Sequence, residues 1–433
     1  MMRGLARLLM GAFFREVEVE AAGNLPLDGP TVVVANHQNG LVDGLLLISA
    51  LDRYPRFLGK STLWRILPLR PFLALAGVVP VYRSVDGEAT SRNRAAFETS
   101  RRLLSSRGMV AVFPEGISHD EATLQPLRTG AARIALGAGV EDGAPGVTVV
   151  PVGLTYDAKA RFRSRALVRV GEPIPVDRWA RAYLADAHAA ARDLTEHIAD
   201  GLRAVSPAYE SWRQADDLGR MARVAVRLDA GEVDLATQDD VTRALAAADA
   251  DDPDRLADLR TAFAAYERDL AQLGLTDEQV VSSHQARQSL LADAGTAVEV
   301  AVSLPPAIVG AAIHLVPYQI MKRVGRRPAN EGMKATVKLL GCFFLFIAVY
   351  VSLGVLVGQR FGVAAGVGAL AAAPVCGYVT VRVGDRLNRL NGRRDGIRAV
   401  RRRDGAMATV LADRHEVARL VGGLVGRVVR TTH

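Results

Sequence analysis

Residues 31–43 read TVVVANHQNGLVD, and this stretch decides the fold expected for the N-terminal part of the chain. A run of small and β-branched apolar residues ends at His37, two turn-forming residues follow, and Asp43 precedes a second apolar run at residues 44–48. This order predicts a buried strand, a tight bend and the start of a buried helix. Ligands of open α/β folds bind just past the carboxyl ends of strands, so the histidine and the acid lie where chemistry is expected.

His37 and Asp43 are the first candidate catalytic pair. On one ideal helix, six steps of about 100° would leave them roughly 120° apart, so the bend must bring them together. The alternative is that His37 merely ends a strand while Asp43 occupies the first turn of a helix, where its charge suits the helix dipole. This stretch alone leaves both interpretations open.

Short apolar strands continue to alternate with helical stretches as far as residue 175. Strand-like runs occupy residues 77–83, 109–113 and 147–152. The alternation predicts an α/β domain over residues 1–176, with a sheet flanked by helices. Residues 1–14 mix two arginines with leucines and phenylalanines, which fits equally an amphipathic helix on a membrane surface and an ordinary core helix.

The remainder of the chain lacks this alternation. Residues 177–298 are rich in Ala, Asp and Arg with few strand formers, which predicts a helical spacer or bundle. A membrane region is expected over residues 299–390 and a basic tail over residues 391–433. Within the membrane region, residues 337–357 and 363–381 each supply the roughly 20 apolar residues that a span requires, so they are predicted to form a hairpin.

Residues 301–320 are also apolar, but three prolines and a histidine interrupt them. Basic clusters flank the predicted hairpin on both sides, which places both flanks in the cytoplasm. If the α/β domain is cytoplasmic as well, residues 301–320 cannot cross the bilayer once and leave their basic flank in the cytoplasm. We therefore expect this segment to be re-entrant or to lie in the membrane interface. We expect an integral protein of the cytoplasmic membrane with its catalytic domain on the cytoplasmic face. The alternative is that this segment crosses and the α/β domain faces outward.

The charge and cysteine content of the chain limit which classes of molecule it is expected to bind. The chain has 54 Lys and Arg against 46 Asp and Glu, a net charge of +8, which suggests nucleic acid, anionic lipid or a phosphorylated substrate. Because much of the basic excess brackets the hairpin, membrane lipids are expected as partners and nucleic acid is not. The two cysteines exclude a disulfide framework and a cysteine metal cluster, and no metal-ligand spacing appears.

Four sequence blocks stand in one order along the predicted α/β domain. They are NHQNGLVD at residues 36–43, GVVPVYR at 77–83, FPEGISHD at 113–120 with LRTG at 127–130, and VPVGL at 150–154. Together they resemble the glycerolipid acyltransferase family, which includes glycerol-3-phosphate and 1-acylglycerol-3-phosphate acyltransferases. The similarity covers roughly residues 15–175.

The chain departs from the usual pattern of that family in two places. Five residues instead of four separate His37 from Asp43, and Ile117 and Ser118 stand where the family usually has Thr and Arg. Both variants look like the branch of fungal-type glycerol-3-phosphate/dihydroxyacetone-phosphate acyltransferases. They bear on the identity of the acceptor more than on the chemistry.

The resemblance implies transfer of a fatty acyl group from a thioester, either acyl-CoA or acyl carrier protein, to a hydroxyl of a phosphorylated glycerol. It implies no cofactor and no metal. His37 would take the hydroxyl proton as general base and later protonate the leaving thiolate, while Asp43 holds the imidazole tautomer and stabilises the imidazolium. No protein nucleophile is expected.

Five further residues are predicted to bind substrate. Arg83 and Arg128 follow predicted strands, and a guanidinium suits phosphate oxygens; Lys60 is an additional candidate. Glu115 would bind the free hydroxyl of the acceptor, and the amide of Gly116 would line the site.

Two other functions stay open from sequence. One is the same chemistry on another lysophospholipid or a glycolipid acceptor, and the other is a catalytically silent lipid-binding membrane protein. Neither the type of acyl donor nor the oligomeric state follows from the sequence.

Overall fold

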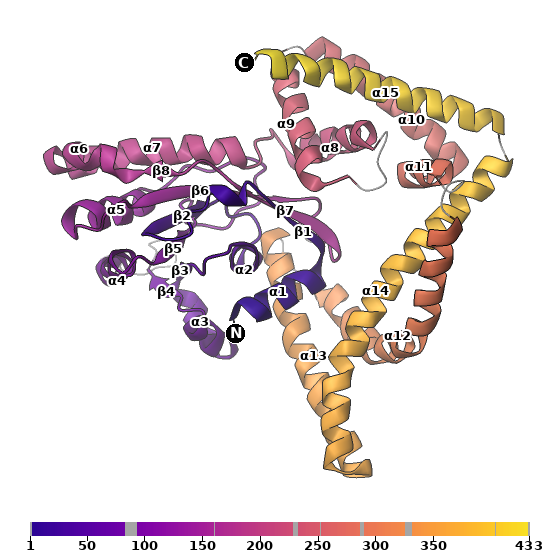
Figure 1. Cartoon of the computed structure of the whole chain (residues 1–433), viewed down its shortest axis with the longest axis horizontal. Helices are drawn as coiled ribbons and strands as arrows, with labels where there is room; N and C mark the ends of the chain where they lie inside the picture. Colours follow the sequence, from indigo (N-terminus) through magenta and orange to yellow (C-terminus); the bar gives the residue numbers. More distant parts are fainter. Residues whose placement is uncertain are drawn as a thin grey trace. The chain divides into compact units, whose positions relative to one another are not determined.

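A computed structural model describes residues 2–82, 93–159, 161–227, 233–251, 253–285, 290–324, 331–402 and 404–431. The chain divides into two compact units (Figure 1). The first comprises residues 1–212 with 328–336, and the second comprises residues 213–327 with 337–433.

The first unit is built on one mixed sheet, to which the described residues contribute eight strands. Its order is β1-β7-β6-β2-β5-β3-β4, with β8 paired to β6. The strands are β1 (Phe14–Glu20), β2 (Thr31–Ala35), β3 (Arg56–Lys60), β4 (Val79–Val81), β5 (Met109–Val112), β6 (Thr148–Tyr156), β7 (Ser164–Val170) and β8 (Ile174–Pro175). All pairs are parallel except those of β6 with β7 and β8. The predicted α/β class is therefore confirmed.

The central strands end together at one edge of the sheet. Val34 of β2 lies opposite Val112 of β5 and Pro151 of β6, all three strands running the same way. Every residue of β2 is buried, as expected for a β-branched strand covered on both faces. The residues that follow β2 and β5 and those that end β6 thus gather at the carboxyl edge.

Helices cover both faces of this sheet. They are α1 (Met2–Phe13), α2 (Leu41–Ala50), α3 (Arg70–Leu75), α4 (Asn93–Ser105), α5 (Gly130–Leu136), α6 (Ala180–Ala185) and α7 (Ala187–Val205). Figure 1 shows α5 and α7 on one side of the sheet and α1 and α2 on the other.

Helix α1 is amphipathic, and its apolar face is buried within the unit. Met10 and Phe13 are buried, and the helix packs against α2. Its arginines, Arg3 and Arg7, donate to the carbonyl oxygens of Asp52 and Ser49 near the end of α2, where cations are favourable. The structure therefore agrees with a core helix.

The expected domain boundary at residue 176 lies too early. Leu194, Ile198 and Leu202 of α7 belong to the same hydrophobic core as Val32 and Val149 of the sheet. Without α7 this face of the sheet would expose a large apolar area. The compact unit consequently continues to residue 212.

The second unit is helical. It contains all or most of the helices α8 (Trp212–Val226), α9 (Leu235–Asp251), α10 (Pro253–Leu273), α11 (Asp277–Gln285), α12 (Leu290–Val324), α13 (Glu331–Phe361), α14 (Val363–Arg402) and α15 (Asp404–Thr431). One core joins α8–α11 with α15, and it contains Tyr266 together with Val417 and Val421. The expected basic tail from residue 391 is therefore not a separate region, because α15 buries its apolar face in the helical core.

Three helices in the described part of the chain are long and apolar enough to cross a membrane. They are Gly295–Val324, Leu339–Phe361 and Val363–Asn388. The last two meet at Gly362, where a positive φ of 92° turns the chain back, and Gly354 packs closely against Gly366. These helices indicate a membrane protein.

The expectation that prolines interrupt residues 301–320 is wrong. Helix α12 continues through Pro305, Pro306 and Pro317. A proline removes one backbone hydrogen bond and bends a helix, but helices packed on neighbours tolerate it. Gly310 supplies such packing, since a side chain there would collide with the carbonyl of Cys376 in α14. Whether residues 301–320 cross the bilayer stays a prediction.

Candidate active site

The structure brings His37 and Asp43 together. His37 follows β2, Asp43 lies in the first turn of α2, and Nδ1 of the imidazole is 2.9 Å from Oδ2 of the carboxylate. Gly40 makes the bend with φ 57° and ψ −128°, a conformation that essentially only glycine adopts. Asp43 is fully buried, whereas the His37 side chain is 18% exposed. When Nδ1 donates to Asp43, Nε2 of His37 is left as a proton acceptor.

Two further donors hold the Asp43 carboxylate. The backbone N–H of Asn39 donates to Oδ2 over 2.8 Å, and the hydroxyl of Tyr156 donates to Oδ1. Burial, and then the neighbouring Asp43 charge, raise the pKa of Tyr156 well above its usual value, so the phenol stays protonated. Sequence reasoning missed Tyr156. The available signal was a polar residue at the carboxyl end of a strand, two positions beyond the VPVGL block.

An aromatic ring and a buried amide fix the position of His37. The ring of Phe113 stacks on the imidazole with centroids 4.0 Å apart and an interplanar angle of 12°. The side chain of Asn36 forms two hydrogen bonds with the backbone of Leu154: its Nδ2 donates over 3.0 Å, and its Oδ1 accepts over 2.7 Å. These contacts clamp the end of β2 between β5 and β6.

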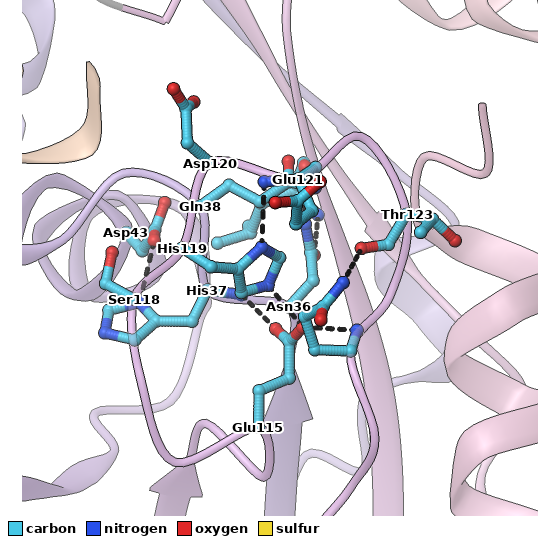
Figure 2. A network of polar contacts seen from close by, with 12 residues as sticks. Asn36, His37, Gln38, Asp43, Glu115, Ser118, His119, Asp120, Glu121 and Thr123 are labelled. Atoms are coloured by element: carbon cyan, nitrogen blue, oxygen red, sulfur yellow. Dashed lines mark hydrogen bonds and ion pairs between the residues drawn. The ribbon is translucent and has the colours of Figure 1, made fainter. Parts of the chain in front are cut away.

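Glu115 contacts the backbone of His37 and belongs to a buried polar network (Figure 2). One carboxylate oxygen accepts from the backbone N–H of His37 over 2.7 Å. The other accepts from the backbone N–H of Gln125 over 2.8 Å and pairs with Nε2 of His119. His119 also donates its backbone N–H to the carbonyl of His37 over 3.2 Å. Direct contact between Glu115 and an acceptor hydroxyl stays a prediction.

Gly116 and Arg128 lie against each other. Gly116 has φ 75°, and a Cβ there would stand 2.5 Å from Nε of Arg128, so the arginine side chain passes over the glycine. The Gly116 amide donates to the carbonyl of Phe113, and the Arg128 amide donates to that of Pro114. The Arg128 side chain is exposed, and it forms no ion pair with an acid in the part of the chain that the structure describes.

The other predicted cations lie on the neighbouring strands. Lys60 is the last residue of β3, at the same carboxyl edge, and is exposed. Arg83 lies outside the described residues; β4, which precedes it, ends at Val81. The binding of phosphate by these residues stays a prediction.

The two departures from the usual block pattern meet at this site. The N–H of Gly40, in the longer bend, donates to Oγ of Ser118 over 3.2 Å. The bend and the loop after β5 therefore support each other beside the His37–Asp43 pair.

The chain is similar to known acyltransferases over this region. Residues 16–155 match the family model described as Acyltransferase. A stretch of 267 residues is 32% identical to glycerol-3-phosphate O-acyltransferase 2 of Saccharomyces cerevisiae, covering 58% of this chain and 34% of that protein. The 1-acyl-sn-glycerol-3-phosphate acyltransferase alpha of Ovis aries is 32% identical over 168 residues, covering 37% of this chain and 55% of that protein.

Among solved structures, the 1-acyl-sn-glycerophosphate acyltransferase PlsC of Thermotoga maritima matches with 21% identity and a TM-score of 0.35. That match covers 46% of this chain and 76% of the other. The chain spans about a third to a half of the length of the two curated relatives.

Proposed function

We propose which reaction the whole protein catalyses, from the match of residues 16–155 to the Acyltransferase family model and from the similarity to glycerolipid acyltransferases. It transfers a fatty acyl group from acyl-CoA or acyl carrier protein to a hydroxyl of glycerol-3-phosphate or 1-acylglycerol-3-phosphate. The observation that carries the proposal is the hydrogen-bonded pair of His37 and Asp43 at the carboxyl edge of the sheet, inside the matched region.

His37 acts as general base and then as general acid. Its Nε2 removes the proton of the acceptor hydroxyl as the oxygen attacks the thioester carbonyl carbon. When the tetrahedral intermediate collapses, the C–S bond breaks and the thiolate takes the proton back from the imidazolium. The products are an ester and a free thiol. Asp43 stabilises the imidazolium between these two steps, and the stacked ring of Phe113 keeps the imidazole plane fixed.

Recognition of the acceptor phosphate is assigned to the cations at the same edge. The exposed guanidinium of Arg128 can give two parallel N–H donors to phosphate oxygens. Lys60 adds a positive charge from the end of β3. Arg83, which lies outside the described residues, is proposed as a third phosphate ligand from its position in the sequence. The Gly116 amide already donates within its own turn, so this residue contributes mainly by letting Arg128 pass close to the backbone.

The three long apolar helices support a location of the enzyme in a membrane. An acylated glycerol phosphate is itself amphipathic, so its synthesis at a bilayer surface spares transport of the product through water. If residues 301–320 lie in the membrane interface and do not cross, the basic residues that flank the hairpin on both sides assign the catalytic domain to the cytoplasmic face.

Purified full-length protein tests the proposal. Acyl-CoA and acyl carrier protein are each offered with glycerol-3-phosphate, dihydroxyacetone phosphate and 1-acylglycerol-3-phosphate, and ester formation is measured. His37→Ala should lower kcat by about 10³-fold, whereas His188→Ala, at an exposed position of α7, should match the wild type. Ester formation by His37→Ala at the wild-type rate would refute the mechanism.

A further inference from the structure

We infer that Tyr156 is a positioning residue of this active site: its hydroxyl holds the Asp43 carboxylate in the orientation that His37 requires. The inference rests on the proposed function. It goes beyond that function by adding a third side chain to the pair, contributed by a different strand.

The geometry leaves the Asp43 carboxylate with one orientation. Oδ2 faces Nδ1 of His37 and the N–H of Asn39, and both bonds come from the same bend. Oδ1 points the other way, and the Tyr156 hydroxyl donates to it from the end of β6. The Asp43 carboxylate is planar, so a hydrogen bond to Oδ1 restrains its rotation about the Cβ–Cγ bond. This keeps Oδ2 directed toward the planar imidazole.

The phenol ring is itself fixed in place. Phe14, which is fully buried at the start of β1, stacks on Tyr156 with centroids 5.7 Å apart and an interplanar angle of 23°. The Asn39 side chain, beside the phenol, donates to the carbonyl of Lys159 over 3.1 Å. From the end of β6, Tyr156 therefore contacts the start of β1 through its ring and the start of α2 through its hydroxyl.

The hydroxyl also moderates the charge that His37 meets. A donor to Oδ1 draws part of the carboxylate charge away from Oδ2 and so weakens the attraction between Asp43 and an imidazolium. Without it, the full charge of the carboxylate faces the imidazole. The other ionisable groups around His37, Glu115 beneath its backbone and His119 beyond Glu115, keep their contacts in such a variant.

Tyr156→Phe removes the hydroxyl and keeps the ring. We expect kcat to fall about 10-fold, with the KM of each substrate within about twofold of the wild type. We also expect the acidic limb of the kcat profile to move to higher pH. Tyr183→Phe is the matched control, because Tyr183 also donates its phenol hydroxyl to a carboxylate, that of Glu141, at a site that does not include His37. This control should behave like the wild type.

A second measurement does not depend on turnover. Diethylpyrocarbonate modifies only unprotonated imidazole, so the pH dependence of His37 modification, followed by peptide mass spectrometry, reports how tightly its proton is held. The midpoint should rise in Tyr156→Phe and stay unchanged in Tyr183→Phe. If the wild type acylates none of the acceptors, the proposed function fails, and this midpoint still decides the role of Tyr156. An unchanged midpoint in Tyr156→Phe, or an unchanged kcat and pH profile in an active enzyme, would overturn the inference.

Discussion

Asp43→Asn is the substitution that separates charge from geometry at this site. Asparagine has the shape of aspartate, and its amide oxygen can accept from His37 and Asn39 as Oδ2 does. Its amide nitrogen then faces Tyr156, whose hydroxyl can rotate from donor to acceptor. The buried network therefore stays paired, and the variant should fold. Asp43→Ala would instead leave three buried donors without an acceptor.

The expected loss follows from the distance between the two groups. At 2.9 Å and an effective dielectric constant of about 20, an imidazolium and a carboxylate attract by about 6 kcal/mol, which corresponds to about 10⁴-fold in rate. Solvent reaches the partly exposed imidazole and screens some of this attraction. We therefore expect kcat to fall by about 10³-fold. The opposite amide orientation, with the nitrogen toward His37, would favour the wrong tautomer and lower kcat as well.

The assay follows release of the free thiol from acyl-CoA in detergent or proteoliposomes, over a range of acceptor concentrations. Asp43→Asn should change kcat and leave the acceptor KM within a few-fold of the wild type, because the carboxylate contacts neither Arg128 nor Lys60, the predicted phosphate ligands that the structure describes. A thermal unfolding curve confirms that the variant is folded. If folded Asp43→Asn retained more than a tenth of the wild-type kcat, the imidazolium would not need this carboxylate and the reasoning would be refuted.

Three further substitutions test other parts of the molecule. Arg128→Ala should raise the KM for a phosphorylated acceptor at least about 10-fold and leave the KM for acyl-CoA unchanged in the same steady-state assay; equal changes for both substrates would contradict phosphate recognition. Gly40→Ala forces an L-residue into φ 57°, ψ −128°, at a cost of about 1–3 kcal/mol, so both kcat and the melting temperature should fall; a variant with wild-type values of both would show that the bend is not strained. Arg414→Met removes the guanidinium that donates to the largely buried Asp277 over 2.9 Å, while Arg227 stays 3.5 Å from the same carboxylate, and it should destabilise the second unit by about 2 kcal/mol, measured by urea denaturation. Arg419→Met, on the exposed side of the same helix, is its control and should leave the urea midpoint unchanged.

The pairing of His37 with Asp43 was predictable because its signal is local. A buried strand, a glycine bend and an acid at the start of a helix lie within 13 residues, and the geometry of the bend does the rest. Tyr156 carries no such signal, since 113 positions separate it from Asp43. Only the pairing of β6 beside β2 brings the two together. The direction in which the Tyr156 hydroxyl points depends on a packing partner, Phe14, at the other end of the domain sequence.

The same dependence on packing partners far away in the sequence explains why the boundaries expected at residues 176 and 391 differ from those of the structure. Helix α7 and helix α15 both have amphipathic sequences, and periodicity shows that each buries one face without showing which surface covers it. For α7 the partner is the sheet, so the first unit extends past residue 176. For α15 the partner is the core of α8–α11, so basic residues read as a lipid-facing tail include Arg414, whose side chain is buried against Asp277.

The spacing of the catalytic block shows how a local sequence variant and a distant one can depend on each other. An additional residue between His37 and Asp43 lengthens the bend, and a backbone N–H before a helix start has no partner within the helix. Here Gly40 supplies that N–H, and Ser118 accepts it. At position 118 a serine hydroxyl can accept this hydrogen bond, whereas the side chain of the arginine usual in the family pattern has no acceptor atom. The two departures are therefore physically linked: the Gly40 N–H of the longer bend donates to the Ser118 hydroxyl of the loop after β5, beside the His37–Asp43 pair.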